Sequence, residues 1–376
     1  MRTTPSCEQL AAGIQTWIRC ESPSNSPPDL AAMVALVEHH ASSMGLATVV
    51  SSLGEGTGPL LHVSNRASGD GRAGILILGH LDTVHPVGTL LQNECRIEGD
   101  RLYGPGSYDM KAGAYLALTA LGQLTAPGSC ALPVDFLLVP DEETGSHGSR
   151  PLIEQFARNA RYALVCEPAR AHTGSCVTAR KGTGLMRLSV LGRPAHAGAQ
   201  HEKGRSAIRE MAHQVLALEA MTDYERGITV SVGTIRGGTV TNTVPSLCEA
   251  MVDFRVPDAQ AGQETLARLR ALSPIAADVT LNIDVELNRP PMVRTEAVAA
   301  LLARAQNWAR EAGFSLQEAP MTGGGSDGNF TAALNVPTLD GLGADGDGPH
   351  TLHEYVLVST LSQRLKFWDL MLRHLD

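Results

Sequence analysis

Three short apolar segments of the sequence each lead directly to a histidine or a carboxylate. Apolar runs of this length, bounded by glycine or polar residues, are typical of strands buried on both faces of a parallel sheet. In an open α/β sheet of this kind, ligands bind outside the carboxyl ends of the strands. The pattern therefore predicts an α/β domain with a polar site at one edge of its sheet. The segments are 75–78, 134–140 and 162–166, and they lead to His80, to Glu142 with Glu143, and to Glu167.

The first of these sites contains a His-x-Asp pair. If the chain stays extended after the strand, His80 and Asp82 point in the same direction. His80 could then bind a metal through one ring nitrogen, while Asp82 orients the ring. The alternative is a loop histidine beside a capping aspartate, because a two-residue pattern of this kind is common.

Two further groups of carboxylates are candidates for the same site. Asp109 stands just before an Ala- and Leu-rich segment, residues 112–124, that predicts a helix, and a helix N-terminus favours a carboxylate. Residues 141–143 place three carboxylates in a row, and their repulsion raises their pKa values unless a cation neutralises them. The alternatives are an ordinary N-cap for Asp109 and a solvated charge run for residues 141–143.

The character of the sequence changes after about residue 176. Alternating apolar segments and amphipathic helices then follow in the order β-α-β-β-α-β, which predicts a split βαβ unit of ferredoxin-like type. A chain of 376 residues is also long for a single core. We therefore expect a catalytic domain formed by residues 1–176 and 289–376, with residues 177–288 as an inserted domain.

The composition argues against several classes of function. The net charge of −9 and the absence of a Lys/Arg run disfavour a nucleic-acid partner. No stretch reaches the roughly 18 apolar residues of a membrane span, and the first residues lack the apolar segment of a signal peptide. The seven cysteines are scattered without a Cys-x-x-Cys pair, which disfavours a disulfide framework and a zinc ribbon. We expect a reducing, cytoplasmic location.

The candidate residues together form a ligand set that suits divalent metal ions. Two histidines with several carboxylates suit Zn²⁺ or a similar ion. Two neighbouring ions need a bridging carboxylate, with one histidine and one further carboxylate for each ion. One glutamate is then left as a general base for metal-assisted hydrolysis. The candidates are His80, Asp109, Glu142, Glu143, Glu167 and His350.

These motifs resemble those of the zinc-dependent aminoacylase/carboxypeptidase family of metallopeptidases. That family includes glutamate carboxypeptidase, acetylornithine deacetylase, succinyl-diaminopimelate desuccinylase and peptidase T. The resemblance covers nearly the whole chain, including the insertion, and its motifs are specific only in combination. They are GHLDTV (79–84), GPGSYDMKAG (104–113), DEETGS (141–146), CEP (166–168), AHAG (195–198) and GGGSD (323–327).

The resemblance implies a role for each residue of the metal site. It implies two Zn²⁺ ions per chain, for which Co²⁺ or Mn²⁺ could substitute, with Asp109 as the bridge and a cis peptide bond between Asp109 and Met110. Asp82 would orient the first histidine, and Glu142 would be the general base. The remaining ligands would be His80, Glu143, Glu167 and His350. In the family the last histidine usually precedes a glutamate by four residues, so Glu354 favours His350, but His353 stays open because this spacing varies.

The resemblance also implies functional residues in and near the insertion. His196 would reach across a homodimer interface and stabilise the oxyanion in the partner's site, although an exposed loop histidine is the alternative. Asn242 and Arg255 would hold the substrate's carboxylate, because a planar guanidinium suits this group; the alternative for Arg255 is a surface residue. Gly324 and Gly325 could let the backbone approach the substrate, or form an ordinary flexible loop.

The implied function is hydrolysis of the amide bond of an N-acyl amino acid or short peptide that carries a free carboxylate, in the manner of glutamate carboxypeptidase. The first alternative is a specialised amidohydrolase or aminohydrolase that acts on a non-peptide amide or an aryl amine. The second is a non-catalytic binding protein on the same fold. The intact ligand set, together with Glu142, argues against the second alternative.

Overall fold

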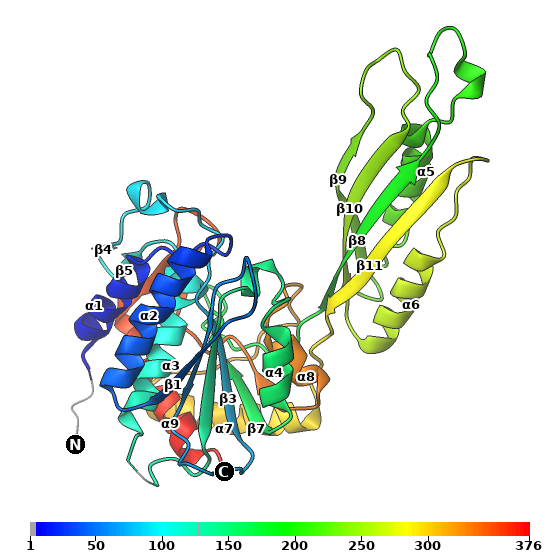
Figure 1. The fold of residues 1–376 in the computed structure, drawn as a ribbon. Coiled ribbons are helices and arrows are strands. Elements are labelled where there is room, and N and C mark those ends of the chain that lie inside the picture. The colour runs from blue at the N-terminus through cyan, green and yellow to red at the C-terminus, as the bar shows by residue number, and fades with distance from the viewer. Residues whose placement is uncertain (1–4, 127) are drawn as a thin grey trace. The chain divides into compact units, whose positions relative to one another are not determined.

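The computed structural model describes residues 5–126 and 128–376, and the chain divides into two compact units (Figure 1). The first unit contains the chain up to Ala179, then Arg294–Thr322 and Ser326–Asp376. The second contains Arg180–Val293 and the short segment Gly323–Gly325. The predicted insertion, residues 177–288, therefore covers most of the second unit.

The sheet of the first unit is mostly parallel, as predicted. Its strands lie in the order β1-β2-β6-β3-β7-β12. Strand β3 pairs in parallel with β6 and β7, and β12 pairs in parallel with β7, whereas β1 and β2 are antiparallel. All residues of β3 and β6 are buried, which agrees with their continuous apolar character. The strands are β1 (Ala47–Ser51), β2 (Leu60–Ser64), β3 (Gly74–His80), β6 (Val134–Val139), β7 (Ala160–Val165) and β12 (Thr338–Leu339).

Helices cover both faces of this sheet. Along β3, Ile75 and Ile77 contribute to one core, whereas Leu76 and Leu78 contribute to the other, because successive side chains point to opposite faces. Helices α1, α2, α3, α7 and α9 supply the first core, and α4 and α8 supply the second (Figure 1). The helices are α1 (Cys7–Ile18), α2 (Pro27–Ser43), α3 (Ala112–Gln123), α4 (Arg150–Ala157), α7 (Glu296–Ala312), α8 (Gly328–Ala333) and α9 (Leu361–His374).

A second, smaller sheet of the first unit joins two distant parts of the chain. Strand β14 pairs with β5, so the loop that contains His350 lies against the segment that precedes Asp109. These strands have two or three residues each, which is too short to produce a periodic pattern in the sequence. The order is β13 (Gly346–Asp347), β14 (Tyr355–Leu357), β5 (Arg101–Tyr103) and β4 (Arg96–Glu98).

The second unit contains a four-stranded antiparallel sheet with two helices. Its elements follow the expected order β-α-β-β-α-β, and its strands lie in the order β11-β8-β10-β9. Met186, Leu188 and Val190 of β8 alternate into the core that the helices cover. The elements are β8 (Gly182–Leu191), α5 (Ala207–Glu219), β9 (Thr229–Gly237), β10 (Leu247–Val256), α6 (Ala259–Arg270) and β11 (Thr280–Arg289).

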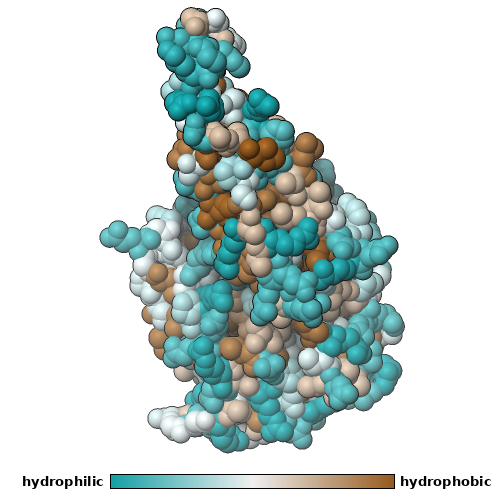
Figure 2. All heavy atoms as spheres, turned by 90° about the vertical axis from the view of Figure 1, so that its right-hand side faces the viewer, coloured by the Kyte–Doolittle hydropathy of each residue, from teal (hydrophilic) through white to brown (hydrophobic). Residues whose placement is uncertain are grey.

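Apolar side chains remain exposed on the second unit. Leu216 and Ile208 of α5 are 71% and 42% exposed, and Ile235 of β9 is 52% exposed. Brown, hydrophobic side chains are visible among teal, polar ones on the surface in Figure 2. Across residues 5–126 and 128–376, we find no helix with the length and apolar character needed to cross a membrane.

Candidate metal centre

Asp109 lies between two histidines, His80 and His350, that are far apart in the sequence. Its Oδ1 is 3.1 Å from Nε2 of His80, and its Oδ2 is 3.3 Å from Nε2 of His350. Each oxygen of one carboxylate thus faces a different imidazole. This is the arrangement that a carboxylate bridging two metal ions requires.

Two further carboxylates extend the cluster, one toward each histidine. Glu143 Oε2 is 3.3 Å from Nε2 of His350, and Glu167 Oε1 is 3.9 Å from Nε2 of His80. Ligand atoms of His80, Asp109 and Glu143 lie within 4.8 Å of one another, as do those of His80, Glu142 and Glu167. Two ligands of a tetrahedral zinc ion, each at 2.0–2.1 Å from the metal, lie about 3.3 Å apart. The nitrogen and oxygen atoms are thus close enough together to form a candidate metal-binding cluster.

The parallel sheet explains why these residues meet. His80 ends β3, and the turn that begins with Glu142 and Glu143 follows β6. Glu167 follows β7, and β6, β3 and β7 are neighbours in the sheet. The carboxyl ends of adjacent parallel strands meet at one edge, as predicted from the sequence.

Asp109 belongs to an irregular turn, Ser107–Lys111, that directly precedes α3. Its φ and ψ of −112° and 94° are not helical. The peptide bond between Asp109 and Met110 is cis, which confirms the expectation from the resemblance. The turn therefore presents the carboxylate of Asp109 in a backbone conformation that a regular helix start would not provide.

The cluster has the electrostatics of a cation site. Hydrogen bonds to Asp109 and Glu143 raise the pKa of His350 to about 10. Burial raises the pKa of Glu143 to about 7, although the hydrogen bond with His350 opposes this shift. Burial also opposes ionisation of Asp109, but hydrogen bonds with His350 and His80 outweigh it and hold its pKa below the ordinary value. Neighbouring carboxylates thus create a negative potential that a cation would neutralise.

The ring of His80 contacts Asp82, two residues further along the chain. Its Nδ1 donates to the carbonyl oxygen of Asp82 at 2.9 Å, whereas the Asp82 carboxylate is 3.4 Å away. This bond keeps a proton on Nδ1, so Nε2, which faces Asp109 at 3.1 Å, is the nitrogen that a metal ion would use. Both the carbonyl and the carboxylate of Asp82 thus lie next to the His80 ring, and the role of Asp82 in orienting His80 stays a prediction. The carboxylate of Asp82 also accepts the backbone N–H groups of Glu142 and Glu143, at 3.2 Å and 3.1 Å.

Of the two candidate histidines in the last loop, the structure brings His350 to the cluster. His350 has a positive φ of 62°, a conformation that is uncommon for a residue with a side chain. Nε2 of His350 lies within 4 Å of the carboxylates of Asp109 and Glu143. His353 is exposed, and among the described residues no acidic side chain lies within 4 Å of its ring nitrogens.

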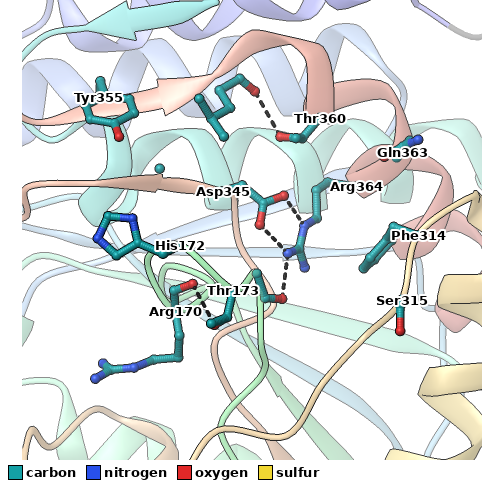
Figure 3. Close-up of a pocket in the computed structure, with 13 residues that line it drawn as sticks. Arg170, His172, Thr173, Phe314, Ser315, Asp345, Tyr355, Thr360, Gln363 and Arg364 are labelled. Carbon is teal, nitrogen blue, oxygen red and sulfur yellow. Dashed lines mark hydrogen bonds and ion pairs between the residues drawn. The ribbon is translucent and has the colours of Figure 1, made fainter.

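A buried ion pair holds the segment that leads into the His350 loop. Arg364 of α9 is 1% exposed, and its Nη2 and Nε contact the two carboxylate oxygens of Asp345 at 2.6 Å and 2.9 Å. Nη2 also donates to the carbonyl of Gly174 at 2.8 Å, as Figure 3 shows. The two side chains line a cavity of about 300 Å³, and they fix the start of β13 against α9.

His196 lies in an exposed turn of the second unit. Its Nδ1 accepts the backbone N–H groups of Gly198 and Ala199 at 3.2 Å and 3.1 Å. A neutral imidazole whose Nδ1 accepts must carry its proton on Nε2. The turn is also held by Asn242, whose carbonyl accepts the N–H of Ala197. The exposed His196 therefore presents an N–H donor outward.

The other predicted substrate contacts are engaged within the second unit. Arg255 forms a forked pair with Asp253, at 2.8 Å and 2.6 Å, and its Nη1 donates to the carbonyl of Gly323 at 3.3 Å. The carbonyl of Gly324 accepts from Arg180 at 3.2 Å. A Cβ on Gly325 would lie 2.7 Å from Cδ of Arg289, so a larger residue there would displace the Arg289 side chain.

Comparison with known proteins agrees with this geometry. Residues 76–374 match the sequence model of peptidase family M20/M25/M40. This match covers more than half of the chain. The chain belongs to this family. It is 29% identical over 357 residues to carboxypeptidase G2 of Pseudomonas sp. (strain RS-16), covering 94% of this chain and 86% of the relative. It is also 29% identical over 331 residues to succinyl-diaminopimelate desuccinylase of Azoarcus sp. (strain BH72), covering 82% and 84%.

Solved structures show the same fold. An aminopeptidase PepT from Bacillus cereus ATCC 10987 superposes with a TM-score of 0.78 at 21% identity, and the match covers 99% of each chain. Membership of the M20/M25/M40 family, together with these relatives, makes this protein a hydrolase that acts on amide C–N bonds. The predicted family and enzyme class are confirmed.

The sequence alone did not assign two buried residues that contact the ligand loops in this M20/M25/M40 member. From the sequence, Glu354 only favours His350 as the last ligand, and His85 is expected either to lie behind the ligands or to form part of the cleft wall. Their side chains meet at 3.0 Å beneath the turn that contains Asp109. The signal for Glu354 was its fixed spacing after His350; nothing in the sequence distinguishes His85 from a loop histidine.

Proposed function

We propose that this protein is a dinuclear zinc hydrolase that cleaves the amide bond of an N-acyl amino acid or short peptide with a free carboxylate. The observation that carries the proposal is the position of Asp109, whose two oxygens each face a different histidine. His80 with Glu167 would hold one ion, and His350 with Glu143 would hold the other. When bound, the ions would polarise the amide carbonyl and make water a stronger nucleophile.

Glu142 is the general base in this proposal. One of its ligand atoms lies within 4.8 Å of those of His80 and Glu167, so its carboxylate is at the site. Four other residues already account for the two histidine–carboxylate sets, and Asp109 lies between them. Glu142 would take a proton from the attacking water and deliver it to the amine nitrogen as the C–N bond breaks. Water supplies the hydroxyl group of the new carboxylic acid, so the atoms balance.

His196 would stabilise the oxyanion from a neighbouring subunit. Its Nε2 carries a proton that can be donated to the negatively charged oxygen of the tetrahedral intermediate. The second unit would act as the dimerisation domain, and the exposed apolar residues Ile208, Leu216 and Ile235 offer surface for such an interface. A homodimer is therefore part of the proposal.

Arg255 and Asn242 would bind the substrate's carboxylate, with Gly324 and Gly325 near the substrate backbone. The likeness to carboxypeptidase G2 over 94% of this chain favours glutamate carboxypeptidase-like cleavage. A specialised amidohydrolase acting on a non-peptide amide or aryl amine would use the same ligand set. All seven cysteines are free, which is consistent with a cytoplasmic location.

Metal analysis and a substrate screen test this proposal. We expect about two zinc ions per chain after zinc loading, and hydrolysis of N-acyl amino acids or dipeptides that carry a free carboxylate. Glu142→Gln should retain the metal and lose turnover. One ion or none per chain would overturn the dinuclear centre, and an active Glu142→Gln variant would overturn the role of Glu142. Activity confined to aryl amides would favour the alternative function.

A further inference from the structure

Glu354 is a fully buried carboxylate that lies next to the cluster without belonging to it. Its Oε1 accepts the backbone N–H groups of Tyr108 and Asp109, each at 2.8 Å. Its Oε2 accepts the backbone N–H of Gly106 at 2.9 Å and faces Nε2 of His85 at 3.0 Å. Four donors thus converge on the two oxygens of one side chain.

The number of donors matches the chemistry of a carboxylate. An ionised carboxylate only accepts hydrogen bonds and offers about four lone-pair positions. Nε2 of His85 must therefore carry a proton, and His85 is 8% exposed, so it donates within the protein interior. No amide side chain can replace this acceptor fully, because its NH₂ group would face two of the four donors.

Two of the three backbone donors, Tyr108 and Asp109, belong to the turn Ser107–Lys111 that presents Asp109, and the third, Gly106, directly precedes it. In that turn the backbone is not helical at Asp109 and Met110, so the hydrogen bonds of a regular helix are not available there. A buried N–H group without an acceptor costs about 1–3 kcal/mol. The carboxylate of Glu354 accepts these N–H groups and so stabilises this backbone conformation.

Glu354 also lies only four residues after His350. It therefore connects the loop that contains His350 with the turn that contains Asp109, through side chain-to-backbone bonds rather than through a ligand. A displacement of either segment would change the separations of 3.1 Å and 3.3 Å between Asp109 and the two histidines.

We infer that Glu354 is a positioning residue that fixes Asp109 between the two metal ions, and that His85 supports it as its fourth hydrogen-bond donor. This inference rests on the proposed dinuclear centre. Residues that orient metal ligands in this way typically contribute 10–100-fold to metal affinity or activity. Loss of the acceptor should therefore weaken metal binding, because Asp109 would no longer reach both ions in one geometry.

Zinc affinity of the full-length protein, measured by competition with a chelator, tests the inference directly. We expect Glu354→Gln to weaken binding of at least one zinc ion by about 10–100-fold, and to change the absorption spectrum of the cobalt-loaded protein. Glu210→Gln is the matched control. Glu210 is 1% exposed and accepts the backbone N–H groups of Ile275 and Ala276 at 2.9 Å, in the second unit, so the same chemical change there should leave zinc affinity unaltered.

A milder pair of variants covers the case in which Glu354→Gln does not fold. His85→Phe keeps a ring but removes the donor, whereas His85→Gln retains an N–H donor at a similar distance from the backbone on a flexible side chain. We expect His85→Phe to weaken zinc binding severalfold and His85→Gln to restore most of the loss. The circular dichroism of the metal-free proteins shows whether each variant is folded.

The outcomes separate this inference from the proposed function. A wild-type protein that binds fewer than two zinc ions overturns the dinuclear centre itself. A wild-type protein that binds two ions, combined with folded Glu354→Gln and His85→Phe variants of unchanged affinity and unchanged cobalt spectrum, overturns the positioning role alone. Equal losses in Glu354→Gln and Glu210→Gln would also overturn it, since they would reflect general destabilisation.

Discussion

The carboxylate of Asp82 accepts the backbone N–H of Glu143 at 3.1 Å. The same oxygen, Oδ2, accepts the hydroxyl of Ser24 at 2.7 Å, and the other oxygen, Oδ1, accepts the N–H of Glu142 at 3.2 Å. Asp82 comes two residues after His80, whose ring donates to the Asp82 carbonyl. One residue therefore fixes the first histidine through its backbone and the glutamate turn through its side chain. Asp82 therefore connects the end of β3 with the turn after β6 through hydrogen bonds.

Asp82→Asn should impair the site although it changes one atom. The amide NH₂ of asparagine would face one of the two backbone N–H groups, and two donors cannot bond to each other. We expect a 10–100-fold loss in kcat/KM, together with weaker zinc binding. Steady-state kinetics and metal analysis measure both effects. Ser24→Ala is the control, because it removes one bond to Asp82 and leaves both backbone contacts; a threefold or smaller loss is expected, about 0.7 kcal/mol. Unchanged kinetics in Asp82→Asn would contradict this assignment.

Asp135 should contribute stability that depends on pH. Burial opposes its ionisation, but hydrogen bonds with His62 and Arg66, at 3.0 Å and 2.7 Å, hold its pKa below the ordinary value. A carboxyl group with a lowered pKa in the folded state stabilises the protein above its unfolded pKa of about 3.9, and this contribution is lost as the pH falls through the folded pKa. Asp135→Asn should therefore lower the free energy of unfolding by about 2 kcal/mol at pH 7.

Urea denaturation at two pH values checks the sign of this effect. The difference between wild type and Asp135→Asn should shrink as the pH is lowered from 7 toward 3, because the Asp135 carboxyl group takes up a proton in the unfolded chain before it does so in the folded protein. A difference that stays constant or grows on acidification would show that the ion pairs of Asp135 do not provide the stabilisation.

The strands and the first ligands could be predicted because their signals are local. Continuous apolar character identifies β3 and β6, and parallel topology then brings His80, Glu143 and Glu167 to one edge. The alternating pattern of β8 and β10 likewise predicts a sheet with one covered face.

The supporting contacts could not be predicted in the same way. A carboxylate appears identical in a sequence whether it binds a metal, as proposed for Asp109, or accepts backbone N–H groups, as Asp82 and Glu354 do. The pairing of Arg255 with Asp253 is also invisible, because it depends on how side chains turn on one face of β10. The short strands β5 and β14, which align Glu354 with the Asp109 turn, leave no periodic signal.

Arg364→Met should destabilise the first unit strongly. It leaves the carboxylate of Asp345 without its cation in a mostly buried position, and breaking a buried ion pair costs about 3–5 kcal/mol. The double variant Asp345→Asn/Arg364→Met should recover part of the loss, since it removes the uncompensated charge. Chemical denaturation of the three proteins measures these differences. If the single variant loses less than about 1 kcal/mol of unfolding free energy, the Arg364–Asp345 pair contributes no more than an exposed salt bridge does, and the prediction is wrong.

Arg255→Ala should raise KM for substrates with a free carboxylate. A charge-assisted hydrogen bond contributes about 1.5–3 kcal/mol, which corresponds to an increase of about 10–100-fold. The increase should disappear when the substrate's carboxylate is converted to an amide, because the guanidinium then has no anion to bind. Arg187→Ala is the matched control, since Arg187 is exposed on the neighbouring strand β8. An equal rise in KM for both substrates would argue against carboxylate recognition by Arg255.

Mixing two inactive variants tests whether His196 acts across a dimer. Glu142→Gln lacks the general base, and His196→Ala lacks the proposed oxyanion donor. In a mixed two-fold dimer, one site combines both defects, whereas the other combines an intact Glu142 with the partner's intact donor. Random exchange of equal amounts makes half of the dimers mixed, so about a quarter of the wild-type activity should return. Co-purification of the untagged variant with an affinity-tagged partner variant confirms that the subunits have exchanged. Exchange without recovered activity would show that His196 does not serve the neighbouring site.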